Sequence, residues 1–181
     1  VVFGERIRPS PYNMKFNQPI NCKSVCKKDY AKGDKDKSKK LKFLKKGILL
    51  NYNHHWIVDN MPITWCYDVE SGQKYCSTGF PIGCYVDKNG KQKDACVISN
   101  KYSESNTYYV FNHLDITISY HSGYNTDWGE ELGWNGGRIV AAKLEPRGIK
   151  HRRPGDCSDT NPVMGIRGDV EDVSFNYTYS V

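Results

Sequence analysis

Residues 107–120, TYYVFNHLDITISY, decide the fold class of this chain. Apolar and polar side chains alternate along this stretch, and the alternation defines two faces. One face carries Tyr108, Val110, Leu114, Ile116, Ile118 and Tyr120, and the other carries His113, Asp115, Thr117, Ser119 and His121. A period of two residues is typical of a strand with one buried and one solvated face. We therefore expect a half-buried β-strand whose histidine-bearing face lies in water.

The same pattern recurs in both directions from this stretch. Residues 173–181, VSFNYTYSV, alternate more regularly still, and residues 137–144 repeat the pattern. In the C-terminal stretch the expected inner face carries Val173, Phe175, Tyr177, Tyr179 and Val181, and the expected solvated face carries Ser174, Asn176, Thr178 and Ser180. Shorter strands are expected at residues 11–16, 52–58, 63–68, 82–86 and 95–99, with turns at residues 70–72 and at Asn89-Gly90. Many short antiparallel strands predict one mainly β domain over residues 1–181, an antiparallel β-sandwich or jelly-roll-like fold.

One helix interrupts this pattern. Eight lysines lie between Lys32 and Lys46, and Leu41, Leu44 and Ile48 recur at helical spacing. The segment predicts a short amphipathic helix that starts near residue 36 or 38 and ends at Gly47. Its lysines are either a solvated face, as most charge runs are, or a basic patch for an anionic glycan or lipid headgroup. The candidate patch comprises Lys39, Lys40, Lys42, Lys45 and Lys46.

The wider charge pattern does not favour nucleic acid as a partner. The chain has 26 Lys and Arg against 20 Asp and Glu, a formal charge of +6. Aromatic residues do not interleave with the lysine run in the way that single-stranded nucleic-acid surfaces require.

The cysteines indicate an oxidising compartment. Cys66, Cys76, Cys84 and Cys96 lie within thirty-one residues, with no C-x-x-C motif among them, so disulfides are favoured over structural zinc. Predicted hairpins favour the pairs 66–76 and 84–96, and the pairs 66–84 and 76–96 stay open as the alternative.

The remaining cysteines leave an odd number. Seven cysteines in total mean that at least one of Cys22, Cys26 and Cys157 is free or bonded to a cysteine outside this chain, and we favour the second. The start at Val1 without a methionine or leader suggests a piece of a longer precursor. No apolar run reaches the ~18 residues that span a bilayer, so we expect any membrane anchor outside this piece.

Several unbroken strings resemble one family. They are LNYNHHWIVDNMPITWCYD at 50–68, GFPIGCY at 79–85, DACVIS at 94–99, RIVAAKLEP at 138–146 and YTYSV at 177–181, with FGERIRPSPY at 3–12 and FLKKG at 43–47. These strings closely resemble the non-cytoplasmic N-terminal domain of the nonaspanins, the transmembrane 9 superfamily. The resemblance extends over nearly the whole chain.

The resemblance implies a location and a role. Nonaspanins carry a lumenal domain ahead of nine membrane-spanning helices, reside in Golgi and endosomal membranes, and in some cases reach the cell surface. They are associated with the sorting or localisation of membrane proteins and with cell adhesion, and no enzymatic activity is established for them. The expected partners are therefore membrane-protein cargo or the protein's own transmembrane part. The family domain also includes an upstream cysteine, which would be the missing partner of Cys22, Cys26 or Cys157.

A second functional hypothesis is a free-standing secreted carbohydrate-binding module, with glycans as ligands. It depends on a glycine-rich loop that is longer than the family pattern, so no family role carries over to it. Its candidate binding residues are Tyr124, Asp127, Trp128, Glu130, Glu131 and Trp134. Exposed tryptophans beside carboxylates bind sugars or protein partners. Tryptophans that fold back onto the core are the favoured interpretation, because most large aromatic side chains are buried.

Other site types find little support. His113 and His121 stand about 26 Å apart on a straight strand, and His54 and His55 point to opposite faces, so neither pair predicts a metal site. We find no nucleophile elbow, no H-E-x-x-H and no phosphate-binding glycine loop, and we expect no catalytic residue and no cofactor. Asn176 heads the one N-glycosylation sequon, on the polar side of its predicted strand.

Overall fold

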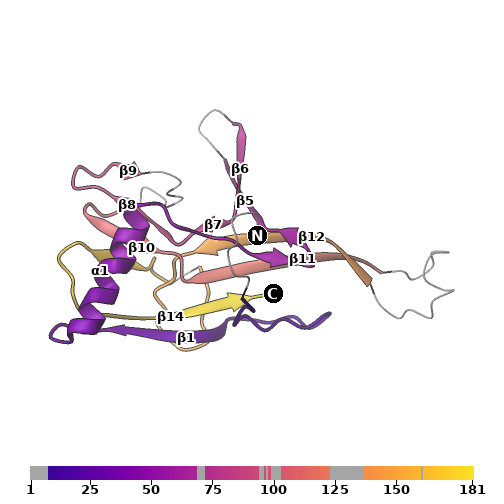
Figure 1. Cartoon of the computed structure of the whole chain (residues 1–181), viewed down its shortest axis with the longest axis horizontal. Helices are drawn as coiled ribbons and strands as arrows, with labels where there is room; N and C mark the ends of the chain where they lie inside the picture. Colours follow the sequence, from indigo (N-terminus) through magenta and orange to yellow (C-terminus); the bar gives the residue numbers. More distant parts are fainter. Residues whose placement is uncertain are drawn as a thin grey trace.

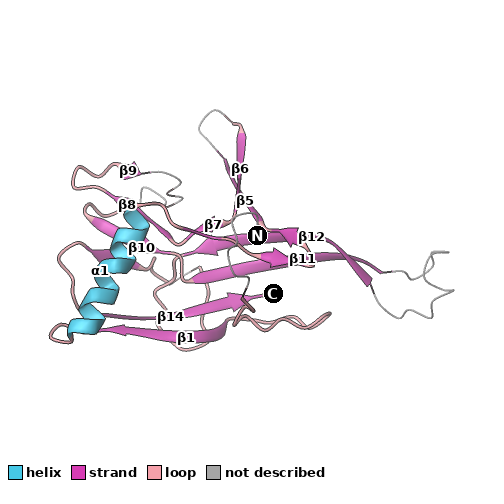
Figure 2. Ribbon diagram, in the orientation of Figure 1, coloured by secondary structure: helices cyan, strands magenta, loops and turns pink. Residues whose placement is uncertain are grey.

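The computed structural model describes residues 8–68, 72–93, 96, 98, 103–122, 137–159 and 161–181 (Figure 1). This part of the chain is mainly β, with one helix and several sheets of mostly antiparallel strands (Figure 2). The predicted mainly β class with a single short helix and disulfide bonds is confirmed. No helix in these residues is both long enough and apolar enough to cross a membrane.

The larger sheet has the strand order β1-β14-β11-β12. Its strands are β1 (Lys23–Tyr30), β14 (Val173–Ser180), β11 (His113–Ser122) and β12 (Gly137–Arg147). Neighbouring strands are antiparallel except β11 and β14, which run parallel where residues 113–115 meet residues 178–180. The two strands β14 and β11 therefore lie side by side at the centre of this sheet.

The second sheet has the order β13-β10-β8-β9. Its strands are β13 (Gly165–Arg167), β10 (Thr107–Val110), β8 (Gly83–Val86) and β9 (Gln92–Lys93). Three separate two-stranded ribbons accompany the two larger sheets. The ribbons pair β2 (Asn53–His54) with β7 (Phe80–Pro81), β3 (Ile57–Val58) with β4 (Met61–Pro62), and β5 (Thr64–Asp68) with β6 (Lys74–Thr78).

Helix α1 (Lys35–Leu49) packs against β1, β8 and β10. The Asp34 carboxylate caps its first turn by accepting hydrogen bonds from the backbone N–H groups of residues 36 and 37. Leu41 and Ile48 are buried, as their spacing predicted. The predicted end at Gly47 is wrong. Gly47 is buried inside the helix, where an added Cβ would lie 3.1 Å from Ile82, so this glycine serves close packing and not termination.

Four further strand predictions need correction. Residues 107–120 were predicted as one strand, but Phe111 and Asn112 separate β10 from β11, and the two strands lie in different sheets. Residues 11–16 form no strand, and β1, which was not predicted, has polar residues on both faces. The predicted strand at 52–58 is divided into β2 and β3. At 95–99 only Cys96 and Ile98 are described, and neither is in a strand. An edge strand such as β1 buries little apolar surface, and it therefore lacks the alternation that prediction depends on.

The turn at Asn89-Gly90 is also built differently from the two-residue turn that was expected. Gly90 has a positive φ of 79°, but Asn89 does not. The Asp87 carboxylate instead accepts hydrogen bonds from the backbone N–H groups of Asn89 and Lys91, within the five-residue connection (residues 87–91) between β8 and β9.

Candidate functional site

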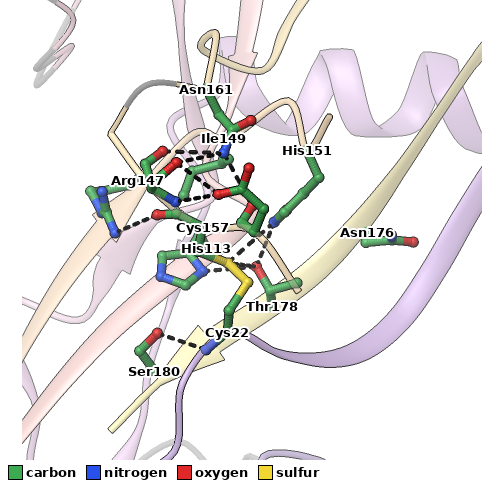
Figure 3. The surroundings of a disulfide bond; sticks show 12 residues. Cys22, His113, Arg147, Ile149, His151, Cys157, Asn161, Asn176, Thr178 and Ser180 are labelled. Atoms are coloured by element: carbon green, nitrogen blue, oxygen red, sulfur yellow. Dashed lines mark hydrogen bonds between the residues drawn. A yellow bond between two sulfur atoms is a disulfide. The ribbon is translucent and has the colours of Figure 1, made fainter. Parts of the chain in front are cut away.

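A polar network lies on the face of β11 and β14 that was expected to be solvated. That expectation holds at Thr117, Ser119 and His121, which are exposed. It is wrong at His113, which is 0% exposed. Residues 147–159 cover this end of both strands (Figure 3). Asn112 anchors the cover, because its amide donates to the carbonyl of Ile149 and accepts from that residue's N–H.

The network links three segments through one hydroxyl group. His113 Nδ1 lies 2.8 Å from the Thr178 hydroxyl, and His151 Nε2 lies 3.0 Å from the same oxygen. On its other side, His113 Nε2 lies 3.1 Å from an Asp115 carboxylate oxygen. The second oxygen of that carboxylate accepts a hydrogen bond from Arg147 Nε at 2.5 Å. These side chains thereby add a connection between β11, β14 and the covering segment to the backbone pairing of the two strands.

These contacts are compatible with one arrangement of protons on neutral imidazoles. A carboxylate only accepts, so the Nε2 of His113 carries the proton that Asp115 receives. In the neutral imidazole, Nδ1 then accepts, and the Thr178 hydroxyl donates to it. The same hydroxyl oxygen accepts from the Nε2–H of His151. With neutral rings, all of these contacts are satisfied when each imidazole carries its proton on Nε2.

Burial and charge act in opposite directions on the acidic member of the network. Burial alone would raise the pKa of the Asp115 carboxyl, but hydrogen bonds from His113 and Arg147 outweigh burial and lower that pKa. Arg147 also forms an ion pair with Asp159 in the covering segment. The Asp115 carboxylate thus stays charged and orients His113.

At His151, burial is the largest influence on the pKa. Burial lowers the pKa of His151, repulsion from His113 lowers it further, and Asp156 opposes both. Because burial disfavours the charged form of His151, protonation of this imidazole opposes folding, and acid weakens the attachment of the covering segment.

The Cys22–Cys157 disulfide lies beside this network (Figure 3). Cys22 is buried, and the Sγ of Cys157 lies 3.5 Å from His151 Nε2. The donor atoms of Cys22, His151 and Cys157 lie within 4.8 Å of one another. With the two sulfurs bonded together the trio offers one imidazole and no thiolate, whereas structural zinc needs four nitrogen or sulfur ligands. In this oxidised state the cluster fits a structural bond and not a metal.

A second feature is an apolar groove of about 600 Å³ beside β11 and β12. Its lining includes Met14, Phe16, Ile118, Tyr120 and Ile139. The rings of Phe16 and Tyr120 meet edge to face at 4.7 Å, and these side chains are 53% and 42% exposed. Two exposed aromatic residues at the rim of an apolar groove suit the apolar side chains of a protein partner.

The disulfide bonds include the two short-range pairs favoured from the sequence. The structure joins Cys66 to Cys76, which face each other across β5 and β6, and Cys84 to Cys96. Cys26, on β1, is half-buried and has no disulfide partner within this chain. A partner outside the chain stays a prediction for Cys26 alone, because the third bond takes up the other two candidates.

The predicted basic patch loses one member. Lys39, Lys40, Lys42 and Lys46 are exposed. Lys45 points elsewhere, because its ammonium group donates to the carbonyl oxygens of residues 167, 168 and 170 at 2.9–3.2 Å and lies over the Tyr108 ring. Lys45 therefore ties α1 to the segment after β13.

The other candidates are placed less favourably. Asn176 is half-buried, and the hydroxyl that completes its sequon, on Thr178, is engaged in the polar network. The candidate binding loop, with Tyr124, Asp127, Trp128, Glu130, Glu131 and Trp134, lies outside the described residues.

Sequence reasoning missed the connection of His113 to His151 through the Thr178 hydroxyl. The two residues stand thirty-eight positions apart in sequence, and the segment that carries His151 has no periodicity to indicate what it covers. The one available signal was the alternation itself, which put a histidine and an aspartate on the same face at His113 and Asp115.

Comparisons with known proteins agree on one family. The family model described as Endomembrane protein 70 matches residues 1–181. Human transmembrane 9 superfamily member 2 is 53% identical over 185 residues, covering 100% of this chain and 26% of that protein. Member 1 of Saccharomyces cerevisiae is 30% identical over 196 residues, covering 98% of the chain and 27% of that protein.

A plant relative extends the range of the match. Member 9 of Arabidopsis thaliana is 26% identical over 160 residues, covering 88% of the chain and 21% of that protein. The chain thus spans about a quarter of the length of these relatives. No solved structure matches the chain.

Proposed function

The chain belongs to the endomembrane protein 70 family, the transmembrane 9 superfamily, and we propose that it is the family's lumenal interaction domain. Members of this family are membrane proteins and are not known to be enzymes. The domain, residues 1–181, acts without catalysis on the lumenal side of Golgi and endosomal membranes, and in part at the cell surface. Its role is to help sort or localise other membrane proteins and to support adhesion.

The disulfides support the lumenal placement. Three intrachain bonds form, and one of them closes a separation of 135 residues. Cytosolic glutathione and thioredoxin would keep such thiols reduced, whereas the secretory pathway keeps them oxidised.

The apolar groove carries the proposal of interaction. Phe16 and Tyr120 expose large rings at its rim, and such anchors contribute more to protein association than the surface around them. The proposed occupant is an apolar segment of a membrane protein, either a cargo or the transmembrane part of the same protein.

The test uses the full-length protein in cells that lack their own copy. The double variant Phe16→Ser/Tyr120→Ser should fail to restore the surface abundance of membrane proteins that depend on this protein. The matched control is Tyr75→Ser, which removes a 61% exposed ring on β6. Restoration by the double variant equal to that by wild type would overturn the groove as the sorting surface.

Two further roles stay predictions. If the loop at 124–134 binds glycans, the variants Trp128→Ala and Trp134→Ala should bind less strongly than wild type on a glycan array. Unchanged binding would exclude the loop as the glycan-binding site. Glycosylation at Asn176 has to precede folding, because the sequon hydroxyl on Thr178 is buried in the folded chain.

A further inference from the structure

The outward face of α1 combines apolar and cationic side chains. Figure 1 shows this helix at one end of the molecule. Lys39, Phe43, Lys46 and Leu50 follow one another at spacings of four, three and four residues, so they form a single stripe. Phe43 is 67% exposed at the centre of this stripe, and Leu50, at the C-cap, is 55% exposed. The buried stripe with Leu41 and Ile48 lies on the opposite side of the helix.

Among the described residues, the lysines on this face form no ion pairs. Asp36 stands three and four residues before Lys39 and Lys40 on α1, but no acidic residue stands at these spacings from Lys42 or Lys46. In the part of the chain that the structure describes, no carboxylate pairs with Lys39, Lys40, Lys42 or Lys46. The nearby acidic residues Asp29 and Glu171 pair instead with Lys27 and Lys32.

The arrangement is unfavourable in the isolated protein. Lys42 and Lys46 stand at i and i+4, where like charges repel and destabilise a helix. The exposed Phe43, between Lys39 and Lys46 on the stripe, leaves apolar surface in water. An anionic apolar interface relieves both costs at once, because it attracts the ammonium groups and accepts the ring.

We propose that this lysine–phenylalanine face of α1 docks onto the surface of a membrane containing anionic lipids. A basic helix face with an aromatic residue at its centre is the arrangement by which surface helices bind lipid headgroups and insert a ring among the acyl chains. A sulfated polysaccharide would match the charge, but it has no apolar phase for Phe43 and Leu50. The exposed apolar side chains therefore favour lipid.

The test is co-sedimentation of the chain with vesicles. Phosphatidylcholine vesicles containing phosphatidylserine should bind the protein, and binding should weaken as salt is added. Each lysine near an anionic surface contributes about fivefold to affinity, so Lys42→Gln/Lys46→Gln should lose about 25-fold. Phe43→Ser should lose about tenfold while heparin binding stays unchanged.

Matched controls separate the face from net charge and general exposure. Lys74→Gln/Lys150→Gln removes the same charge from exposed positions away from α1 and should lose less than twofold. Circular dichroism checks that each variant is folded. Equal binding to pure phosphatidylcholine would overturn the proposal. Full vesicle binding by Phe43→Ser would also overturn it, and so would binding to heparin without binding to vesicles. None of these outcomes depends on whether the groove at Phe16 sorts cargo.

Discussion

Replacing Thr178 by valine tests the polar network most sharply. Valine has nearly the shape of threonine, so the variant opens little space at a side chain that is 2% exposed. It removes the hydroxyl that donates to His113 Nδ1 and accepts from His151 Nε2. His113 is fully buried, and a buried polar atom without a partner costs about 1–3 kcal/mol. His151 is half-buried and can turn to water, so it adds less.

We therefore expect Thr178→Val to lower the free energy of unfolding by about 2–3 kcal/mol. The assay is equilibrium urea unfolding of unglycosylated protein at neutral pH with the disulfides intact. Unglycosylated protein is needed because Thr178 also completes the sequon of Asn176. The control is Thr178→Ser, which keeps the hydroxyl and loses one methyl group, at a cost of about 1 kcal/mol. A valine variant within about 0.5 kcal/mol of wild type would refute the reasoning, and so would a serine variant as unstable as the valine variant.

Three further variants test other parts of the account. Because the folded-state pKa of His151 is lowered, the neutral form is favoured on folding, and stability is lost as the pH falls from about 6.5 toward that lower value. His151→Gln keeps an N–H donor and should flatten this loss in urea unfolding at several pH values; an unchanged profile would argue against the network as its source. Cys22→Ser/Cys157→Ser removes the bond between residues 135 positions apart and should lower the free energy of unfolding by about 5 kcal/mol in the chain-entropy model. A loss below about 2 kcal/mol would contradict a native disulfide at these positions. Lys45→Met should lower the free energy of unfolding by about 1–3 kcal/mol, because three carbonyl oxygens lose a charged donor. The control Lys46→Met should change it by less than about 0.5 kcal/mol. Equal effects of the two variants would show that the contacts of Lys45 do not stabilise the fold.

Local patterns predicted those parts of the fold that one element decides by itself. Alternation placed Phe175 and Tyr179 on the buried face of β14, and helical spacing placed Leu41 and Ile48 under α1. The hairpin of β5 and β6 likewise brings two cysteines together over ten residues, within the reach of local reasoning.

The parts that failed depend on segments distant in sequence. His113 is buried because residues 147–159 lie over it, and nothing within β11 records that cover. The Cys22–Cys157 bond joins residues 135 positions apart, and cysteine counting alone left several pairings open. Lys45 looked like its neighbours because its three carbonyl partners lie more than 120 residues away. Burial imposed by a non-local segment has no local sequence signature.

The location of the domain is the claim on which the proposed function depends, and disulfide mapping tests it directly. The full-length protein would be isolated from cells under alkylating conditions, digested without reduction and analysed by mass spectrometry. A lumenal domain predicts linked peptides for all three bonds of the structure, including the one that joins Cys22 to Cys157. Alkylated thiols at these six cysteines would contradict the lumenal placement and with it the proposed role.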